Sequence, residues 1–177
     1  TIVVGPRYKD HIRDIFIRGK LADDMSLYVH RPTVTDTSAA PLGDDTFYAL
    51  SPVPHLGIGS TDWATEAEPY RQKMQKMLEE RLLPGLGDHL TEQLVFTPNS
   101  FETRYLSPYG SGFSIEPRIL QSAYFRPHNV LVEAPGLYLV GAGTHPGAGL
   151  PGVIASAEVL GTLVPDAPRI ALKMAAE

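Results

Sequence analysis

The first half of the chain contains three short runs rich in β-branched, aromatic or other apolar residues. They span 2–4, 26–30 and 46–50, and a glycine or proline follows each run closely. Such runs, bounded by turn residues, are typical of strands. A fourth apolar run, at 137–140, has the composition of a buried strand. The pattern therefore predicts a sheet of short strands.

Apolar residues recur at helical spacing in the stretches between these runs. They predict a short helix within 7–20 and a longer one over 66–83, which Thr61 or Asp62 would cap. The buried side of the longer helix is expected to consist of Tyr70, Met74, Met77, Leu78 and Leu82. Further helical segments are expected at 86–94, from Thr97 or Asn99 to Glu102, and at 152–163. Helices and strands together predict an α+β fold, a mixed sheet with flanking helices.

Composition excludes several classes of protein. The 177 residues are 43% hydrophobic and 20% charged, which is typical of a globular protein. The sequence has no cysteine, so disulfide scaffolds, zinc–thiolate sites, iron–sulfur clusters and cysteine nucleophiles are excluded. The net charge of −5 gives no support to a nucleic-acid-binding surface. The chain begins with Thr1 and shows no signal-peptide pattern, and we expect it to be a fragment or an excised domain.

One long stretch, 134–157, lacks Asp, Glu, Lys and Arg. It contains six glycines and three prolines, so it could not satisfy its backbone hydrogen bonds as a lipid-exposed helix. We expect it to be buried against another segment or a ligand. Its order is strand, glycine loop and helix, and amides at a helix start favour an anion or a polarised carbonyl.

The residues 147–152 match the dinucleotide-binding pattern Gly-x-Gly-x-x-Gly. The preceding strand ends too early, however, and no second strand with an acidic residue follows. An independent Rossmann domain is therefore rejected. The loop is either the closing half of a dinucleotide site whose opening half lies elsewhere, or a tight strand-to-helix turn without a ligand.

Three segments in this half of the chain resemble the C-terminal part of the bacterial phytoene desaturases, which are FAD enzymes of carotenoid formation. They are Gly110-Ser-Gly-Phe-Ser, Gln121-Ser-Ala-Tyr-Phe-Arg-Pro-His-Asn129, and the run from Gly136 to Glu158 that includes Gly-Ala-Gly-Thr-His-Pro-Gly-Ala-Gly-Leu-Pro-Gly. The segments 27–36 and 52–56 fit the same family in the same order. The resemblance implies an oxidoreductase that introduces double bonds into a C40 precursor such as phytoene by hydride transfer to FAD. It also implies a cytoplasmic location with peripheral contact to the inner membrane, and no nucleic-acid partner.

The resemblance also implies which residues contact the flavin. The cofactor-binding residues would be Gly141, Gly143, Thr144, Gly152 and Val153. Backbone groups of Gly143 and Thr144 would approach the pyrophosphate or ribityl part. Those of Gly152 and Val153 would point at the pyrimidine edge of the ring, where they would stabilise negative charge.

Two side chains are candidates for a catalytic role. His145 either polarises the flavin, lines the substrate tunnel, or hydrogen-bonds the loop and shapes it. Arg126 either neutralises a phosphate or a reduced flavin, or forms a structural salt bridge. No metal site is expected, because no second ligand stands at a recognisable spacing from His145.

Other aromatic residues have weaker assignments. Trp63, with Leu56 and Ile58, is a candidate for lipid contact. Five more either line an apolar tunnel or pack in the core: Tyr105, Tyr109, Phe113, Tyr124 and Phe125.

The resemblance implies a division into three parts. Residues 1–127 would belong to a substrate-binding domain and 128–165 to the closing strand–loop–helix of an FAD-binding Rossmann-like domain, with 166–177 as a tail. The family's N-terminal strand–GxGxxG–helix is not in the sequence, so the isolated chain is expected to bind FAD weakly or not at all. Alternatives are a stand-alone module that binds an apolar lipid or carotenoid without redox chemistry, and a related flavin enzyme such as an amine oxidase or retinol saturase.

Overall fold

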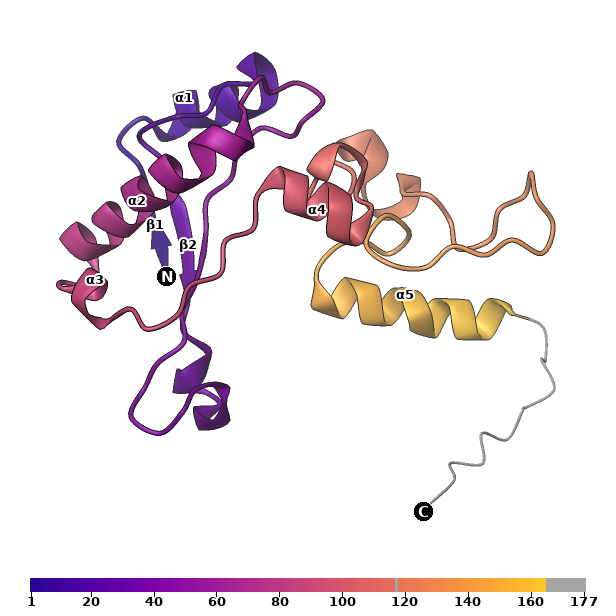
Figure 1. The fold of residues 1–177 in the computed structure, drawn as a ribbon. Coiled ribbons are helices and arrows are strands. Elements are labelled where there is room, and N and C mark those ends of the chain that lie inside the picture. The colour runs from indigo at the N-terminus through magenta and orange to yellow at the C-terminus, as the bar shows by residue number, and fades with distance from the viewer. Residues whose placement is uncertain (117, 165–177) are drawn as a thin grey trace. The chain divides into compact units, whose positions relative to one another are not determined.

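The computed structural model describes residues 1–116 and 118–164, and the chain forms two compact units (Figure 1). The first unit, Thr1–Ser111, contains the sheet and its helices, and the second, Gly112–Glu177, contains the glycine loop. The predicted tail at 166–177 lies outside the described residues. The predicted boundary between residues 127 and 128 separates a substrate-binding part from an FAD-binding part, and it stays a prediction.

The sheet of the first unit has three strands in the order β1, β2, β3. They are β1 (Ile2–Val3), β2 (Leu27–His30) and β3 (Tyr48–Leu50), each within a predicted run. Tyr28 in the central strand pairs with Ile2 on one side and Leu50 on the other. Both pairings are antiparallel, so the expectation of a mixed sheet was wrong. Each connection lets the chain reverse direction instead of crossing over the sheet, and such connections produce antiparallel neighbours.

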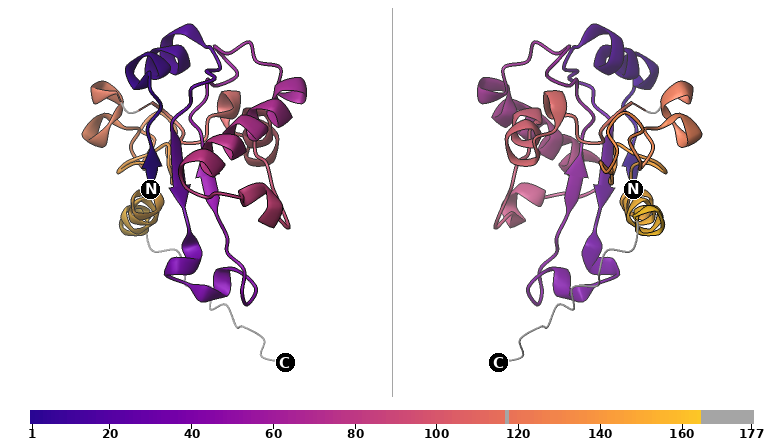
Figure 2. Two further views of the ribbon diagram at one scale, coloured as in Figure 1. Left: turned by 90° about the vertical axis from the view of Figure 1, so that its left-hand side faces the viewer. Right: turned by 90° about the vertical axis from the view of Figure 1, so that its right-hand side faces the viewer.

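The core lies between one face of this sheet and α2 (Trp63–Arg81), which crosses that face in both views of Figure 2. Val3, Leu27 and Val29 point toward the helix because side chains alternate along a strand. Met25, Trp63, Tyr70 and Leu78 complete the buried cluster. The opposite face carries the exposed side chains of Ile2, Tyr28 and Tyr48.

Most of the predicted buried side of α2 is confirmed. Tyr70 and Leu78 are buried, and Met74 and Met77 pack partly against the core. Leu82 was wrongly included, since it follows the last helical residue and is 38% exposed. Burial raises the pKa of Tyr70 to about 12, although its hydroxyl shares a hydrogen bond of 2.7 Å with Ser51.

Trp63 belongs to this core and not to a lipid-facing surface. Its ring meets that of Tyr70 edge to face, with 6.2 Å between ring centroids. The predicted lipid contact of Trp63 was therefore wrong. It stands first in α2, where the helix turns its side chain back over the sheet.

The remaining helices of the first unit are short. They are α1 (Tyr8–Arg13), which continues as a π-helix over Asp14–Arg18, α3 (Leu86–His89) and α4 (Pro98–Tyr105). Thr97 precedes α4, and its N–H donates to Ser100 Oγ at 3.2 Å, as expected for a helix start. The helix predicted over 86–94 ends much earlier, because Leu90 is already extended.

A partly buried charge cluster joins the start of α1 to the segment before β2. Arg7 donates to Asp24 at 2.7 Å and Arg18 donates to Asp14 at 2.6 Å, and these bonds lower the pKa of both carboxyl groups. His11 is buried beside them, and burial lowers the pKa of its imidazole although Asp24 and Asp14 oppose that shift. These contacts anchor α1 to the sheet.

The predicted cap of the long helix provides a stability test. Asp62 accepts a hydrogen bond from the N–H of Ala64 at 3.0 Å, and it is the N-cap of α2. Replacement of Asp62 with alanine is expected to lower the free energy of unfolding by about 1 kcal/mol, because one helix-start donor loses its acceptor. Denaturant unfolding of the full-length protein measures it. Asp62→Asn keeps an acceptor oxygen, so its free energy of unfolding should fall by less than half as much as that of the alanine variant. Equal losses in the two variants would show that Asp62 does not act as a helix cap.

Candidate functional site

The candidate site lies in the second unit, around the loop that leads into α5 (Leu150–Leu163). The predicted strand at 137–140 is wrong. Tyr138 forms one isolated antiparallel bridge with Val130, supported by a bond of 2.8 Å from Leu139 N to Asn129 O. No further strand pairs with this bridge among the described residues, so the ladder is too short to be a strand.

Glycines make the loop before α5 possible. Gly141 has φ 114° and Gly149 has φ 91°, values that L side chains rarely adopt. A Cβ on either glycine would meet nothing within 4 Å, so both present bare backbone to open space. Gly152 differs, because a Cβ there would lie 2.6 Å from the carbonyl oxygen of Gly147. The loop therefore folds back against the first turn of α5, and only glycine allows that approach.

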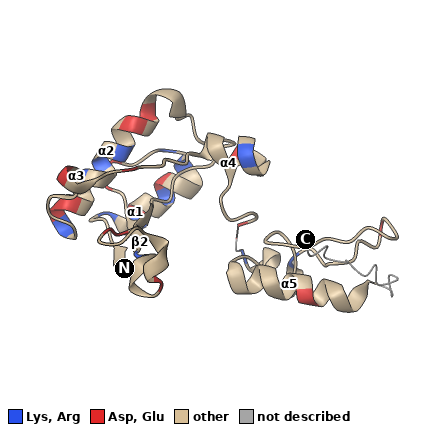
Figure 3. Ribbon diagram, turned by 60° about the horizontal axis from the view of Figure 1, so that its bottom comes forward, with Lys and Arg blue, Asp and Glu red and all other residues tan. Residues whose placement is uncertain are grey.

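The start of α5 has few internal partners for its amides. Gly149 is the N-cap and offers no side chain, and Pro151 has no N–H. Val153 N donates to Gly149 O at 2.9 Å, which leaves Leu150 and Gly152 as the donors at this end. The ribbon of α5 carries almost no colour for charged residues (Figure 3), and Glu158 is its one ionisable residue. Unpaired amides and the helix dipole favour an electron-rich group here.

Arg126 lies beneath this loop and is only 5% exposed. Its Nε and Nη2 donate to the carbonyl oxygen of Ala142 at 3.2 and 2.5 Å, and Nη1 donates to Gln121 O at 3.4 Å. Within residues 1–116 and 118–164, no carboxylate forms an ion pair with it, so the structural salt bridge is not observed. The guanidinium is therefore a clamp on the loop, and its role toward an anion stays a prediction.

His145 has contacts that shape the loop. Its N–H donates to Pro127 O at 2.8 Å, and its ring Nδ1 lies 3.3 Å from Ala123 O. The ring also faces that of His128, with centroids 6.4 Å apart. These bonds join the glycine loop to the segment 123–128. A role toward flavin or substrate stays a prediction.

The other residues predicted to bind the cofactor differ in which of their hydrogen-bonding groups are free of partners within the protein. Thr144 is 7% exposed, and both its N–H and its hydroxyl donate to Gly141 O, at 3.2 and 3.0 Å. The Cα of Gly143 faces Ser114, whose Oγ would lie 2.9 Å from an added Cβ. Gly152 keeps a free amide, whereas the amide of Val153 is used within the helix start. Their contact with a cofactor stays a prediction.

Two buried polar residues were missed by the sequence reasoning. Ser156 on α5 is fully buried at 0% exposure, and Asn129 is 3% exposed. Asn129 Nδ2 donates to Leu139 O and to Ser156 Oγ, both at 3.0 Å, and Ser156 Oγ also lies 2.9 Å from Thr144 Oγ1. Ser156 is the single hydroxyl in the small-residue stretch Ala155–Ala157, which was the available signal.

The second unit has no apolar interior among its described residues. The residues buried there are polar: Arg126, Asn129, Thr144 and Ser156. By contrast, Leu150, Val153, Ile154 and Leu163 of α5 are exposed. Five aromatic residues from both units were predicted either to line an apolar tunnel or to pack in the core. All are exposed, so core packing is wrong for them: Tyr105, Tyr109, Phe113, Tyr124 and Phe125. An exposed apolar surface of this extent is typical of a segment that packs against further protein.

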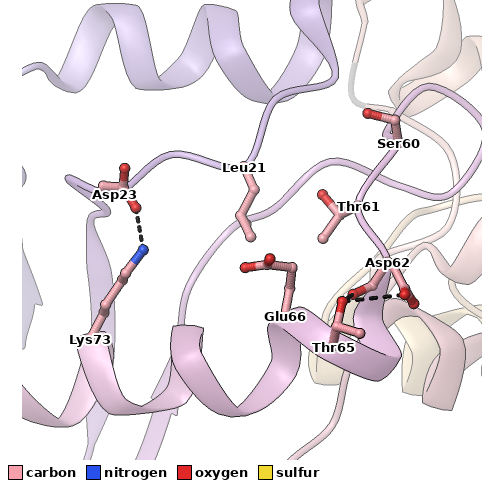
Figure 4. Close-up of a pocket in the computed structure, with 8 residues that line it drawn as sticks. All are labelled: Leu21, Asp23, Ser60, Thr61, Asp62, Thr65, Glu66 and Lys73. Carbon is pink, nitrogen blue, oxygen red and sulfur yellow. Dashed lines mark hydrogen bonds and ion pairs between the residues drawn. The ribbon is translucent and has the colours of Figure 1, made fainter.

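A hollow in the first unit is unsuited to an apolar ligand. It is lined by Leu21, Asp23, Ser60, Thr61, Asp62, Thr65, Glu66 and Lys73 (Figure 4). Lys73 pairs with Asp23, and Thr65 donates to Asp62, so its polar groups largely bind one another. The described residues include no group of three metal-ligating side chains, and none of their helices is long and apolar enough to span a membrane.

Comparison with known proteins identifies close relatives. The chain is 66% identical over 170 residues to "Phytoene desaturase (neurosporene-forming)" of Rhodobacter capsulatus, covering 96% of this chain and 32% of that protein. It is 53% identical over 164 residues to "Phytoene desaturase (lycopene-forming)" of Pseudescherichia vulneris, covering 93% and 33%. It is 38% identical over 163 residues to "4,4'-diapophytoene desaturase (4,4'-diaponeurosporene-forming)" of Staphylococcus aureus, covering 90% and 32%. No protein-family model matches the chain.

These relatives confirm the resemblance expected from the glycine-loop segments. The similarity extends over nearly the whole chain, from the strands of the first unit to α5. The chain spans about a third of the length of the curated relatives that it matches.

Proposed function

We propose that this chain is the C-terminal third of an FAD-dependent phytoene desaturase, an oxidoreductase that introduces double bonds into a C40 carotenoid precursor. The observation that carries the proposal is the 66% identity over 96% of the chain to a protein named as a phytoene desaturase. The backbone of the glycine loop and the start of α5 support it, because they offer bare peptide groups where a flat cofactor would lie.

The residues present fit one side of FAD. The open space beside Gly141 and Gly149 would admit a cofactor that side chains would otherwise block. The free amides of Leu150 and Gly152, together with the positive end of the α5 dipole, fit its electron-rich groups. Arg126 adds a buried positive charge that lacks a carboxylate partner among the described residues. We assign the FAD-contacting role to Gly141, Gly143, Thr144, Gly152 and Val153 as a set.

FAD, when bound, would accept the hydrogen removed from a saturated carbon–carbon bond of the substrate. The residues of this chain would hold the cofactor in place and stabilise its charge. Gly152, with a free N–H in the first turn of α5, would donate to the flavin ring and stabilise the charge that develops on reduction. Arg126 holds the carbonyl of Ala142 and keeps the loop closed, and it also carries positive charge beneath it. His145 joins the loop to Pro127 through its backbone N–H.

The first unit fits the substrate side of such an enzyme. Its sheet turns Ile2, Tyr28 and Leu50 onto one face in a single paired row, away from the core of the unit. An uncharged polyene is held by apolar surface, and phytoene, a C40 hydrocarbon, is the proposed substrate. Because that hydrocarbon is collected from lipid, we propose a cytoplasmic enzyme in peripheral contact with the inner membrane.

The proposed division of labour follows the sequence interpretation. Residues 1–127 would contribute to the substrate-binding domain, and 128–165 would complete a Rossmann-like FAD-binding domain. The remainder of the protein would cover the exposed apolar side chains of α5, such as Leu150 and Ile154. The relatives are about three times as long as this chain, which leaves ample sequence for that cover.

Two alternatives are less well supported. A stand-alone module that binds an apolar lipid or carotenoid without redox activity would need its own apolar interior, and the described part of the second unit lacks one. A related flavin amine oxidase or retinol saturase is not favoured, because the relatives reported above carry the name of phytoene or diapophytoene desaturase.

The test is product formation by the full-length protein that contains this chain. The purified protein, phytoene in liposomes, FAD and an electron acceptor such as a quinone or oxygen should yield a coloured carotenoid with more conjugated double bonds. Removal of FAD should abolish the product. If no acceptor gives desaturated product although FAD is bound, the proposed reaction is wrong.

A further inference from the structure

A closed hydrogen-bond network lies between the glycine loop and α5. Ser156 Oγ contacts three groups, namely Asn129 Nδ2 at 3.0 Å, the N–H of Gly141 at 3.2 Å and Thr144 Oγ1 at 2.9 Å. The partners come from two stretches of chain, Asn129 from the segment before the loop and Gly141 and Thr144 from the glycine loop itself, and Ser156 lies on the second turn of α5. Ser156 is fully shielded from solvent, and its bonds to Asn129 and Thr144 are buried.

The direction of each bond follows from the donors that are available. Asn129 Nδ2 and Gly141 N can only donate, so Ser156 accepts from both. Thr144 gives its hydroxyl hydrogen to Gly141 O at 3.0 Å, so the hydroxyl of Ser156 donates to Thr144. A serine hydroxyl has one hydrogen and two lone pairs, and this arrangement uses all of them.

Both hydrogens of the Asn129 side-chain amide are used in the same way. One hydrogen of Nδ2 goes to Ser156 and the other to Leu139 O at 3.0 Å. Its backbone carbonyl accepts from Leu139 N at 2.8 Å. The amide orientation is thereby fixed, because an oxygen at the position of Nδ2 would face an acceptor at Leu139. The hydroxyl of Ser156 and the two hydrogens of Asn129 Nδ2 are therefore all engaged within the protein.

We propose that Asn129 and Ser156 are positioning residues that set the place of the glycine loop, and with it the first amides of α5, against the flavin. This inference rests on the proposed function. Neither side chain touches the cofactor. Both act through Gly141 and Thr144, whose turn they hold against the helix.

The polar character of this junction suits that task. Apolar contacts are non-directional and allow neighbouring segments to slide, whereas a saturated network accepts one geometry. The described part of the second unit buries no apolar side chain, so hydrogen bonds determine where the loop lies. Removal of one partner leaves buried donors without acceptors, which is more costly than the bond itself.

The test uses the full-length protein and two variants. Asn129→Asp keeps the shape but replaces the donating amide by a carboxylate, and Ser156→Ala removes the hydroxyl. We expect each to raise the dissociation constant for FAD at least tenfold. At saturating FAD, kcat should stay at least fivefold reduced and the visible absorption band of the bound flavin should shift, while KM for phytoene changes less than twofold. Asn99→Asp makes the same exchange at an exposed site of α4 and serves as the control.

The possible outcomes separate this inference from the proposed function. If the unaltered protein neither binds FAD nor desaturates phytoene, the proposed function fails. If it does both, and the two variants regain full kcat and an unchanged flavin spectrum at saturating FAD, the positioning role is refuted and the network only adds stability. A variant that does not fold is replaced by Ser156→Cys, which keeps the volume with a much weaker acceptor and should show the same spectral shift.

Discussion

Replacement of Gly152 with alanine is expected to reduce desaturation by the full-length protein at least a hundredfold. A Cβ at this position would lie 2.6 Å from the carbonyl oxygen of Gly147, a backbone atom that cannot rotate away. The loop or the helix start must therefore shift, and misplacement by about 1 Å at a reacting centre costs on the order of 10²-fold in rate. Measurement of kcat/KM for phytoene, together with the dissociation constant for FAD, tests this.

Gly143→Ala provides the matched comparison for Gly152→Ala. The same methyl group would meet only the rotatable Oγ of Ser114, at 2.9 Å, and Gly143 has no positive φ in this structure. Its loss of activity should be at least tenfold smaller. Thermal unfolding shows whether each variant is folded. FAD affinity and activity of Gly152→Ala within twofold of the unaltered protein would show that the close approach of loop and helix has no role.

The second large effect is expected at Arg126. Arg126→Leu should weaken FAD binding by about 10- to 100-fold, because the guanidinium donates twice to the loop carbonyl of Ala142 and once to that of Gln121, and hydrogen bonds to charged groups contribute about 1.5–3 kcal/mol. Without these bonds, the carbonyl of Ala142 is left without its donor and the loop loses its clamp. Titration of the apoprotein with FAD, followed by flavin fluorescence, measures the change.

Arg126→Lys distinguishes the clamp from the charge. Lysine keeps the positive charge but cannot hold Ala142 through two nitrogens of a planar fork. If neutralisation of an anion is the main role, Arg126→Lys should recover most of the FAD affinity, and the recovery should diminish at high salt. If the clamp is the main role, both variants should be equally weak. Unchanged affinity in Arg126→Leu would exclude both roles.

Local patterns predicted the first unit well because its elements follow short-range rules. Asp62 has the chemistry of a helix cap, and Tyr70 and Leu78 are spaced for one helix face. The direction of the strands was not predictable in the same way. It depends on how the connections lead the chain back to β2, which is a property of the tertiary structure.

The sequence predicted the backbone of the site, but not the buried side chains that hold the glycine loop in place. Glycine spacing indicated where peptide groups would be bare, since Gly141 and Gly149 need positive φ. The one local signal was the hydroxyl of Ser156 among small residues, and nothing local pairs it with Asn129. The two residues are 27 positions apart and acquire a role only when the loop brings them together. For Arg126 both sequence interpretations assumed an anionic partner, and the structure instead shows carbonyl oxygens.

The polar interior of the second unit has a thermodynamic consequence. The heat capacity change of unfolding comes mainly from apolar surface that becomes hydrated, and the described part of this unit has little such surface to expose. Separated from the remaining protein, its ordered loop would therefore melt gradually over a wide temperature range. The first unit, with the apolar core around Trp63 and Leu27, should instead unfold with a sharper calorimetric peak. Cofactor occupancy should sharpen that melting, since a ligand that binds only the ordered loop adds its binding free energy to the ordered state.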